Sequence, residues 1–412
     1  MNTFGLVFLG ALFLATAGRL WLGWRQIKYV TAHRDAVPPR FTAEVSLAEH
    51  QKAADYTVAK TRFAMLGLAI EALIVLALAF GGVLQWLHDV SAAWLPEGIA
   101  RGVLLIALVG ALLTLLDVPF DFYRTFVIEE QFGFNKMTPG LFFKDLMKSL
   151  LLGAGLMLPL VAVILWLITA IGPSWWIYAW AVVVVFSIFV TFIAPTLIMP
   201  LFNKFSPLQD PELRQRVEQL AARCGFKIKG LLVMDGSRRS AHGNAFFSGF
   251  GSSKRIVFFD TLLAQLRPAE VEAVLAHELG HFKLRHVMKR MGWSFLLSLG
   301  FFWMLSFLMY QEWFFHGLGI TTPSPAMALI LFALVLPPFT FLLKPLGAMY
   351  SRRHEFEADQ YAVRNASARD LVSALVKLYK DNASTLTPDP LHSAFYDSHP
   401  PATVRIARLQ EA

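Results

Sequence analysis

Residues 102–120 read GVLLIALVGALLTLLDVPF, an apolar run with a single charged residue, Asp117. A helix of about 20 apolar residues is long enough to cross the roughly 30 Å hydrocarbon core of a bilayer. The whole chain has the same character, since 56% of its 412 residues are hydrophobic and only 16% are charged. Soluble domains carry about 25% charged residues. The composition therefore predicts a mainly α, polytopic membrane protein with some polar mass attached.

Six further windows have this length and composition. Together with the first they predict seven spans, at residues 4–24, 63–87, 102–120, 149–171, 176–200, 292–314 and 325–343. The first window has an alternative interpretation as a cleaved signal peptide, because Ala15-Thr16-Ala17 resembles a cleavage site. Residues 1–18 contain no Lys or Arg, however, so the basic segment that opens a signal peptide is missing. We expect an uncleaved span.

The net charge of +8 is a signal of topology rather than of nucleic-acid binding. All but two of the 37 Lys and Arg residues lie in four segments, at 25–62, 121–148, 201–291 and 344–412. These are alternate connections between the predicted spans, and cytoplasmic loops carry such a basic excess. The pattern predicts an N-terminus outside the cytoplasm, and a cytoplasmic location for the last two segments. The bilayer is thus a predicted partner and nucleic acid is not.

Three acidic residues fall within or at the edge of spans: Glu71, Asp117 and Asp121. Ionisable groups at this depth usually face a protein interior or a water-filled cavity. Acids close to the end of a span can instead reach the membrane interface. Both interpretations stay open from the sequence.

Residues 201–291 form the largest polar block. A helix is predicted from Asp210, which precedes a proline at the first helical position. Short β-rich runs follow at 230–235 and 255–260, and either could offer an edge to which a substrate strand adds. Residues 267–290 then read as one long helix that begins near Pro268. After the last span, two more helices are predicted, at 351–364 and 367–382.

The long helix carries the sequence HELGH at 277–281. Four residues advance by about 400° around a helix, so His277 and His281 lie on one face, one turn apart. Both can reach one Zn²⁺ ion, and Glu278 stands where this motif places a general base. His286 is nine residues beyond His277, about half a turn round the same helix. We expect it to be a surface or interface histidine that points away from the ion.

A catalytic zinc site uses three protein ligands and keeps one position open, so a third ligand has to come from elsewhere in the chain. The candidates are His242, Glu355, Glu357, Asp359 and His399. Glu355 and Asp359 are four residues apart and share a helix face. One of them could bind the metal while the other supports a neighbouring residue by a hydrogen bond. An acid so close to Arg352 and Arg353 could equally form a solvated ion pair.

The chain also resembles a known family, the type I CAAX prenyl proteases, which are integral-membrane zinc metallopeptidases. Five motifs carry the resemblance: FVIEEQFGFNKMT at 126–138, HGNAFFSGF at 242–250, HELGHF at 277–282, SRRHEFEADQYA at 351–362 and SHPP at 398–401. They occur in the family's order and are separated by the same spans. The resemblance covers most of the chain.

The resemblance implies a role for each matching residue. His277 and His281 correspond to zinc ligands, Glu355 corresponds to the third ligand, and Glu278 corresponds to the general base that acts on a zinc-activated water. Asp359 corresponds to an acid that pairs with an arginine in the C-terminal tail, and Arg405 occupies that arginine's place. His399 is implied to line the active site, where it is also our candidate donor to the developing oxyanion, with Arg405 nearby. Asn244 is implied to contact substrate.

The family's fold has seven spans around a large water-filled chamber, capped by a small α+β zinc metalloprotease domain of the gluzincin type. We therefore expect four segments: five transmembrane helices with cytoplasmic loops in 1–200, the metalloprotease domain with its HExxH helix in 201–291, spans six and seven in 292–343, and the C-terminal part of that domain with the third ligand in 344–412.

The implied activity is that of a zinc metalloendopeptidase, with one Zn²⁺ per chain, which cuts near the C-terminus of membrane-associated or CAAX-type prenylated proteins. Compact loops and the lack of an obvious endoplasmic-reticulum retention signal suggest a bacterial inner-membrane member. Bacteria generally lack protein prenylation, so one alternative is a quality-control protease without a prenyl requirement. A transporter or metal-delivery protein is a more distant alternative. The paired Gly/Pro-broken spans that a transporter would show are not found in the sequence.

Overall fold

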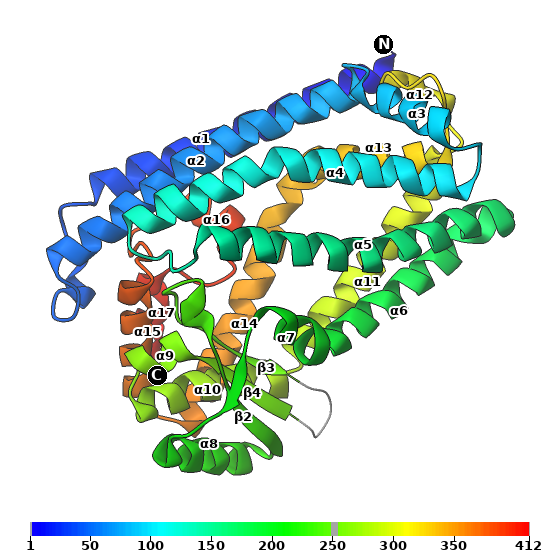
Figure 1. The fold of residues 1–412 in the computed structure, drawn as a ribbon. Coiled ribbons are helices and arrows are strands. Elements are labelled where there is room, and N and C mark those ends of the chain that lie inside the picture. Colours follow the sequence, from blue (N-terminus) through cyan, green and yellow to red (C-terminus); the bar gives the residue numbers. More distant parts are fainter. Residues whose placement is uncertain (1, 249–253, 412) are drawn as a thin grey trace.

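The computed structural model describes residues 2–248 and 254–411. Figure 1 shows long helices on the side of the N-terminus and a small sheet with α8 at the opposite end of the molecule. The helices α11 and α14 join these two parts. The last two residues of the HGNAFFSGF motif, 249 and 250, lie outside the described residues.

Seven helical stretches among the described residues are long and apolar enough to cross a membrane, which confirms the predicted number of spans. They are α1 (Thr3–Ala32), α2 (Leu47–Ala79), α4 (Ile99–Tyr123) with the π-helical turn Arg124–Glu129, α5 (Pro139–Ala170), α6 (Trp175–Ile193) with its flanking turns, α11 (His286–Leu308), and α13 (Pro325–Thr340) continuing into α14 (Lys344–Asn365). Most extend beyond the predicted windows, because the helix continues into polar flanks. Polar caps mark several starts, such as the Ser46 hydroxyl, which accepts from the Glu49 amide.

Two of the differences from the predicted windows change the path of the chain. The second window reached residue 87, but α2 ends at Ala79 because Gly82 adopts a left-handed backbone with φ of 76°. A short helix, α3 (Val83–Trp94), follows that turn. The sixth span begins at His286, six residues before its predicted start, and this shift changes the position of His286 at the metal centre.

Several further helices among the described residues are short. They are α7 (Met199–Phe202), α9 (Asp260–Gln265), α12 (Glu312–Gly317), α16 (Pro390–Tyr396) and α17 (Ala402–Gln410), with 3-10 turns at Pro39–Phe41, Gly172–Ser174, Gly236–Arg238 and Phe341–Leu343 and a second π-helical turn at Ala194–Ile198. Of these, α16 and α17 belong to the C-terminal tail that reaches the metal centre.

In the described part of the chain, the small sheet has four strands in the order β1-β2-β4-β3. They are β1 (Phe205–Pro207), β2 (Ile228–Met234), β4 (Lys254–Phe259) and β3 (Ala245–Ser248). The central pair, β2 and β4, is parallel, and the two outer strands pair antiparallel. The predicted substrate edge at 230–235 or 255–260 is therefore wrong, since both runs are paired on both sides. The edges are the two shortest strands, and β3 directly follows Asn244.

One hydrophobic core joins the two polar segments of the chain. It contains the apolar face of α8 (Pro211–Cys224), the inner side of the sheet, α10 (Pro268–Lys283) and α15 (Ala368–Asp381). Val217, Leu220 and Ala273 are buried there beside Ala374. Residues before the sixth span and after the seventh thus fold together, and α14 lies along α10.

The predicted long helix at 267–290 is interrupted in the structure. It ends at Lys283, and Arg285 takes a left-handed backbone with φ of 57° before α11 begins at His286. A non-glycine residue in this region is uncommon and costs on the order of 1 kcal/mol or more. The turn redirects the chain, so His286 does not continue the helical face predicted for it.

A cavity of about 1020 Å³ lies among the membrane helices, lined by residues of α1, α2, α4 and α13. Glu71, Asp117 and Asp121 all line it. This lining agrees with the cavity interpretation of the three acids. His242 lines the same cavity, so it extends toward the polar domain.

Candidate metal centre

The HELGH sequence lies on α10, and Gly280 brings a second helix close to it. A Cβ at this position would lie 3.0 Å from the Ala358 Cα atom, closer than side chains normally approach a backbone. The absence of a side chain at residue 280 therefore lets α14 pack directly on α10. This close packing carries Glu355, one turn before Ala358, to the two histidines of the motif.

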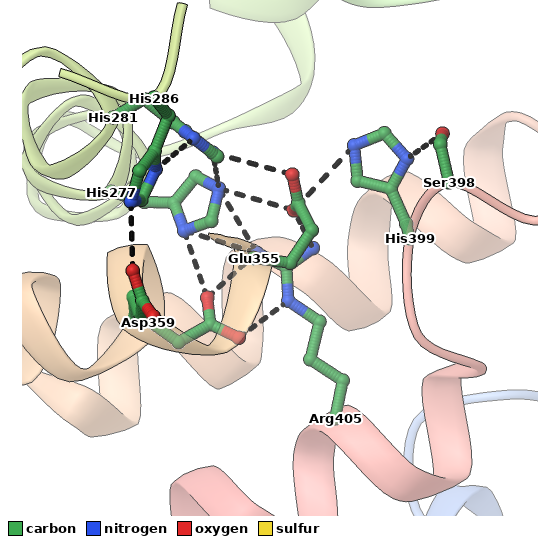
Figure 2. Close-up of polar contacts among 9 residues, drawn as sticks. His277, His281, His286, Glu355, Asp359, Ser398, His399 and Arg405 are labelled. Atoms are coloured by element: carbon green, nitrogen blue, oxygen red, sulfur yellow. Dashed lines mark hydrogen bonds and ion pairs between the residues drawn. The ribbon is translucent and has the colours of Figure 1, made fainter. Parts of the chain in front are cut away.

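Three side chains converge where the helices meet (Figure 2). The Nε2 atoms of His277 and His281 lie 3.2 Å apart. Glu355 places Oε2 at 3.4 Å from His277 Nε2 and Oε1 at 3.3 Å from His281 Nε2. Ligand atoms about 2.0–2.1 Å from one tetrahedral ion lie about 3.3–3.4 Å from one another. The spacing thus fits a single metal ion bound between the three side chains.

The chemistry of the donor atoms also fits a cation. Glu355 Oε2 is buried and has no hydrogen-bond partner among the described residues. Two ring nitrogens facing each other repel when both carry a lone pair, and a cation between them removes that repulsion. Leaving a buried carboxylate oxygen unpaired costs about 1–3 kcal/mol or more. A bound metal ion would satisfy all three side chains.

Asp359 contacts the Nδ1 side of His277, away from the proposed metal, and Arg405 in turn holds Asp359. Asp359 Oδ1 lies 2.8 Å from His277 Nδ1, so the Nδ1–H donates to the carboxylate and leaves Nε2 free to bind metal. Arg405, on α17, donates from Nε and Nη2 to both Asp359 oxygens at 2.8 and 2.7 Å. All three residues are buried. The pair implied by the resemblance is present, while its contribution to catalysis stays a prediction.

The electrostatics of this buried group favour positive charge. Burial and the nearby Arg405 lower the pKa of His277, but the attraction of the Asp359 and Glu355 carboxylates outweighs both, and the pKa lies above its usual value. Burial also lowers the pKa of Arg405, yet the ion pair with Asp359 raises it overall, so the guanidinium stays charged. Two carboxylates thus draw cations into a desolvated site.

His399 lies in the loop before α17, with its ring facing the Glu355 carboxylate (Figure 2). Its Nε2 is 3.5 Å from Glu355 Oε2, and its Nδ1 is 3.0 Å from the Ser398 hydroxyl. The side chain is 62% exposed, so a bound molecule can reach it. Partial desolvation of the ring lowers the pKa of His399, although the negative charge of Glu355 acts in the opposite direction.

The other predicted residues do not belong to this group of three donors. Glu278 follows His277 on α10 and is half-buried. Asn244 is exposed, directly before β3, and its carbonyl accepts a hydrogen bond from the Phe259 amide. His242, one of the open candidates for the third ligand, lies elsewhere. Its Nδ1 is 3.0 Å from Asn382 Oδ1, and its ring stacks on Phe134.

His286 is where the structure contradicts the sequence-based expectation. It was predicted to be a surface or interface residue pointing away from the metal, but its side chain is fully buried. Its Nδ1 atom lies 3.0 Å from His281 Nδ1, and its Nε2 atom lies 3.0 Å from Glu357 Oε2. The reason is the left-handed turn at Arg285. Helical periodicity alone contains no signal of such a turn.

Comparison with known proteins agrees with this arrangement. Residues 26–204 match the family model described as CAAX prenyl protease N-terminal, five membrane helices, and residues 207–412 match that of peptidase family M48. The chain is 37% identical to the CAAX prenyl protease 1 homolog of Arabidopsis thaliana, over 90% of each protein. It is 33% identical to the human homolog, covering 94% of this chain and 90% of that protein. The crystal structure of S. mikatae Ste24p superposes with a TM-score of 0.93 at 30% identity, covering 99% of each chain.

Proposed function

The chain belongs to peptidase family M48, in the branch with the five-helix N-terminal part of CAAX prenyl proteases, and we propose that it cuts CAAX-type substrates at the centre formed by His277, His281 and Glu355. It is a multi-pass membrane metalloprotease. The single observation that carries the proposal is the convergence of three donor atoms within 4.8 Å of one another, with the half-buried Glu278 beside them.

We propose Zn²⁺ as the metal, one ion per chain. Two imidazoles and one carboxylate are a ligand set that catalytic zinc uses, and their buried location suits an ion that is retained. When bound, zinc supplies Lewis-acid chemistry, polarising a carbonyl and making a water molecule more acidic. His277, His281 and Glu355 would hold it, with Asp359 fixing the orientation of His277.

Glu278 is proposed as the general base. A carboxylate next to the ligands can accept a proton from the attacking water and then deliver it to the nitrogen of the leaving peptide, as general acid–base catalysis requires. His399 is proposed to donate a hydrogen bond to the oxygen that becomes negative at the scissile carbonyl, where it would act with the positive field of Arg405. His399 is exposed, so it can donate directly to the substrate. Arg405 is buried, so it contributes only its positive field.

Substrate binding is proposed at the β3 edge rather than at β2 or β4. An outer strand leaves one side open for an extended peptide, which pairs through main-chain hydrogen bonds. Asn244, exposed directly before β3, is proposed to contact such a peptide. Segments 201–291 and 344–412 are proposed to form one catalytic domain, because their helices share one core.

The substrate class follows from the relatives, whose names describe CAAX prenyl proteases. We propose cleavage near the C-terminus of prenylated proteins, with peptide or protein substrates in a membrane. The basic segments support a cytoplasmic metal centre and an N-terminus outside. The bacterial inner membrane is proposed only on the compact loops, and a quality-control protease without prenyl preference is the competing function. Cleavage of a farnesylated peptide no faster than its unprenylated twin would favour that competitor.

The deciding experiment replaces the base alone. Glu278→Gln in the full-length chain should still bind one zinc ion but lose about 10²–10⁴-fold in peptidase activity. The matched control is Glu218→Gln, the same change at an exposed position of α8, which should retain both properties. Full activity in zinc-loaded Glu278→Gln would refute the assignment of the base. Failure of the unmodified chain to bind zinc would refute the proposed centre.

A further inference from the structure

Behind His281 a second histidine and a carboxylate form a row of polar contacts that leads away from the metal centre. We propose that His286 is a positioning residue of this centre: it accepts a hydrogen bond from His281 Nδ1–H and is itself oriented by Glu357. The inference rests on the proposed role of His281 as a metal ligand. It concerns how tightly the metal is held and does not assign His286 any contact with substrate.

The direction of the hydrogen bonds follows from the partners. For His281 Nε2 to bind metal, the ring proton has to be on Nδ1, which lies 3.0 Å from His286 Nδ1. His286 Nδ1 is then the acceptor, so its own proton is on Nε2. That nitrogen lies 3.0 Å from Glu357 Oε2, and a carboxylate can only accept.

The opposite assignment would prevent metal binding at His281 and would create a repulsion at Glu357. If His286 Nδ1 donated, the proton of neutral His281 would be on Nε2, which faces the Nε2 of His277 and Glu355 Oε1. His286 Nε2 would then present a lone pair to the Glu357 carboxylate, which is repulsive. Glu357 therefore selects the tautomer of His286, and His286 in turn selects the metal-binding tautomer of His281.

Glu357 is itself held in place. Arg353, one turn earlier on α14, donates from Nε to Glu357 Oε1 at 3.0 Å. Glu355, Glu357 and Asp359 thus all come from one stretch of α14. Glu355 reaches the metal centre directly, Asp359 supports His277, and Glu357 supports His281 through His286.

Packing fixes the His286 ring. Its side chain is fully buried, and its ring stacks on His354 with centroids 4.0 Å apart and planes 5° from parallel. The Tyr350 ring packs edge-on against His354, with the two ring centroids 4.2 Å apart. The left-handed Arg285 places the residue here, at the cost of an uncommon backbone conformation. Strain of this kind persists where the surrounding structure requires the geometry.

A second metal ion is the competing interpretation, since His286, His354 and Glu357 also bring donor atoms close together. The ring geometry argues against it. An imidazole binds a metal ion in the plane of its ring, along the nitrogen lone pair. Two parallel stacked rings have planes that do not meet, so one ion cannot lie in both. The observed stack therefore suits orientation of His286 and not shared coordination.

The test measures zinc affinity of the purified full-length chain by competition with a chelator, without substrate. His286→Asn retains an acceptor close to the Nδ1 position, whereas His286→Gln places its amide near the Nε2 position. Loss of indirect support to a ligand typically costs about 10–100-fold in metal affinity. We expect His286→Gln to lose this much, His286→Asn to recover most of it, and Glu357→Gln to lose less than His286→Gln.

Because both His286 variants are polar and of similar size, a general loss of packing would affect them alike. Equal zinc affinities of His286→Asn and His286→Gln would overturn the proposal. His354→Phe, which retains a stacking ring without a donor atom, should leave both affinity and stoichiometry unchanged. Two zinc ions in the unmodified chain, one of them lost in His354→Phe, would also overturn it. Neither result depends on peptidase activity, so this proposal and the assignment of Glu278 can fail separately.

Discussion

Charged residues are paired both in the cavity between the membrane helices and at the metal centre, but the two regions treat them differently. In the cavity, Arg19 and Glu71 meet at 3.1 Å with 25% and 52% of their side chains exposed. At the metal centre, Arg405 and Asp359 meet at 2.7 Å with 6% of each exposed. The first pair remains solvated when it separates, whereas the second cannot separate without leaving a charge in a dry environment.

This difference indicates different tasks. A solvated pair contributes little to stability, so its side chains can change position when a molecule enters the cavity. A desolvated and doubly hydrogen-bonded pair holds its atoms in one geometry, because breaking it exposes an uncompensated charge. We therefore expect substitutions at the metal centre to have large effects on metal binding and stability, and substitutions in the cavity to have small ones.

The largest effect is expected at Glu355, the proposed metal ligand from the second part of the proposed catalytic domain. Glu355→Gln removes the carboxylate that both histidines face. Indirect support of a ligand is worth about 10–100-fold in metal affinity, so loss of the ligand itself should exceed about 100-fold and abolish peptidase activity. Metal content after dialysis against a zinc buffer measures this. The control is Glu411→Gln, which makes the same change at an exposed residue of the tail, and zinc retained in Glu355→Gln would contradict the assigned ligand.

The buried pair behind His277 comes next. Asp359→Asn leaves Arg405 charged and without its partner, and this should destabilise the folded protein by about 3–5 kcal/mol, together with weaker metal binding. Thermal unfolding of the metal-free protein in detergent isolates the effect on stability. Arg405→Met alone should destabilise as well.

The double variant Asp359→Asn/Arg405→Met is the control for the two single variants. It removes both charges, so it should be more stable than either single variant, as expected for a coupled pair. Strictly additive losses would show that the two side chains contribute independently, which would contradict a desolvated pair.

How much of this site was predictable depends on whether the signal was local. The spans follow from apolar runs, and the common face of His277 and His281 follows from a four-residue spacing. Their four-residue spacing also puts Glu355 and Asp359 on one helix face, so either acid could have been the third ligand. The choice of Glu355 came from the resemblance to the family. These elements required little knowledge of tertiary packing.

The missed features depend on non-local contacts. The turn at Arg285 occurs at a residue type that seldom adopts a left-handed backbone, so the sequence predicted a continuous helix and placed His286 on the wrong side. Sheet order is decided by pairing partners, and the two edge strands have three and four residues among those that the structure describes. The edge was therefore assigned to the longer and more apolar runs, which turned out to be the central strands.

A buried carboxylate away from the metal centre tests whether burial alone explains the large effects. Glu270 is fully buried on α10 and accepts from Lys377 Nζ at 2.7 Å and from the Ser373 hydroxyl at 2.8 Å. Burial by itself raises the pKa of Glu270, but the bonds from Lys377 and Arg267 outweigh it and hold the pKa at about 2. Because the folded-state pKa is depressed, this stability is present above the usual value near 4.5 and is lost as the pH falls toward 2.

We expect the free energy of unfolding of the unmodified chain to fall by roughly 2–3 kcal/mol more than that of Glu270→Gln over this pH range. Zinc affinity at neutral pH should be the same in both proteins. Denaturant unfolding at several pH values measures the first quantity. A Glu270→Gln variant with weakened metal binding would show that burial in this domain, and not contact with the metal centre, determines metal affinity.

The smallest effect is expected in the cavity. Glu71→Gln breaks the pair with Arg19, and half of the Glu71 side chain is already exposed, so the free energy of unfolding should change by less than about 1 kcal/mol. Zinc affinity and cleavage of a short soluble peptide should also stay unchanged, because Glu71 belongs to the cavity wall and not to the metal centre. Thermal unfolding of Glu71→Gln and Asp359→Asn under the same conditions compares the loss of stability in the two regions. Equal losses in the two variants would mean that the cavity charges are as rigidly held as those at the metal, and that exposure does not separate their tasks.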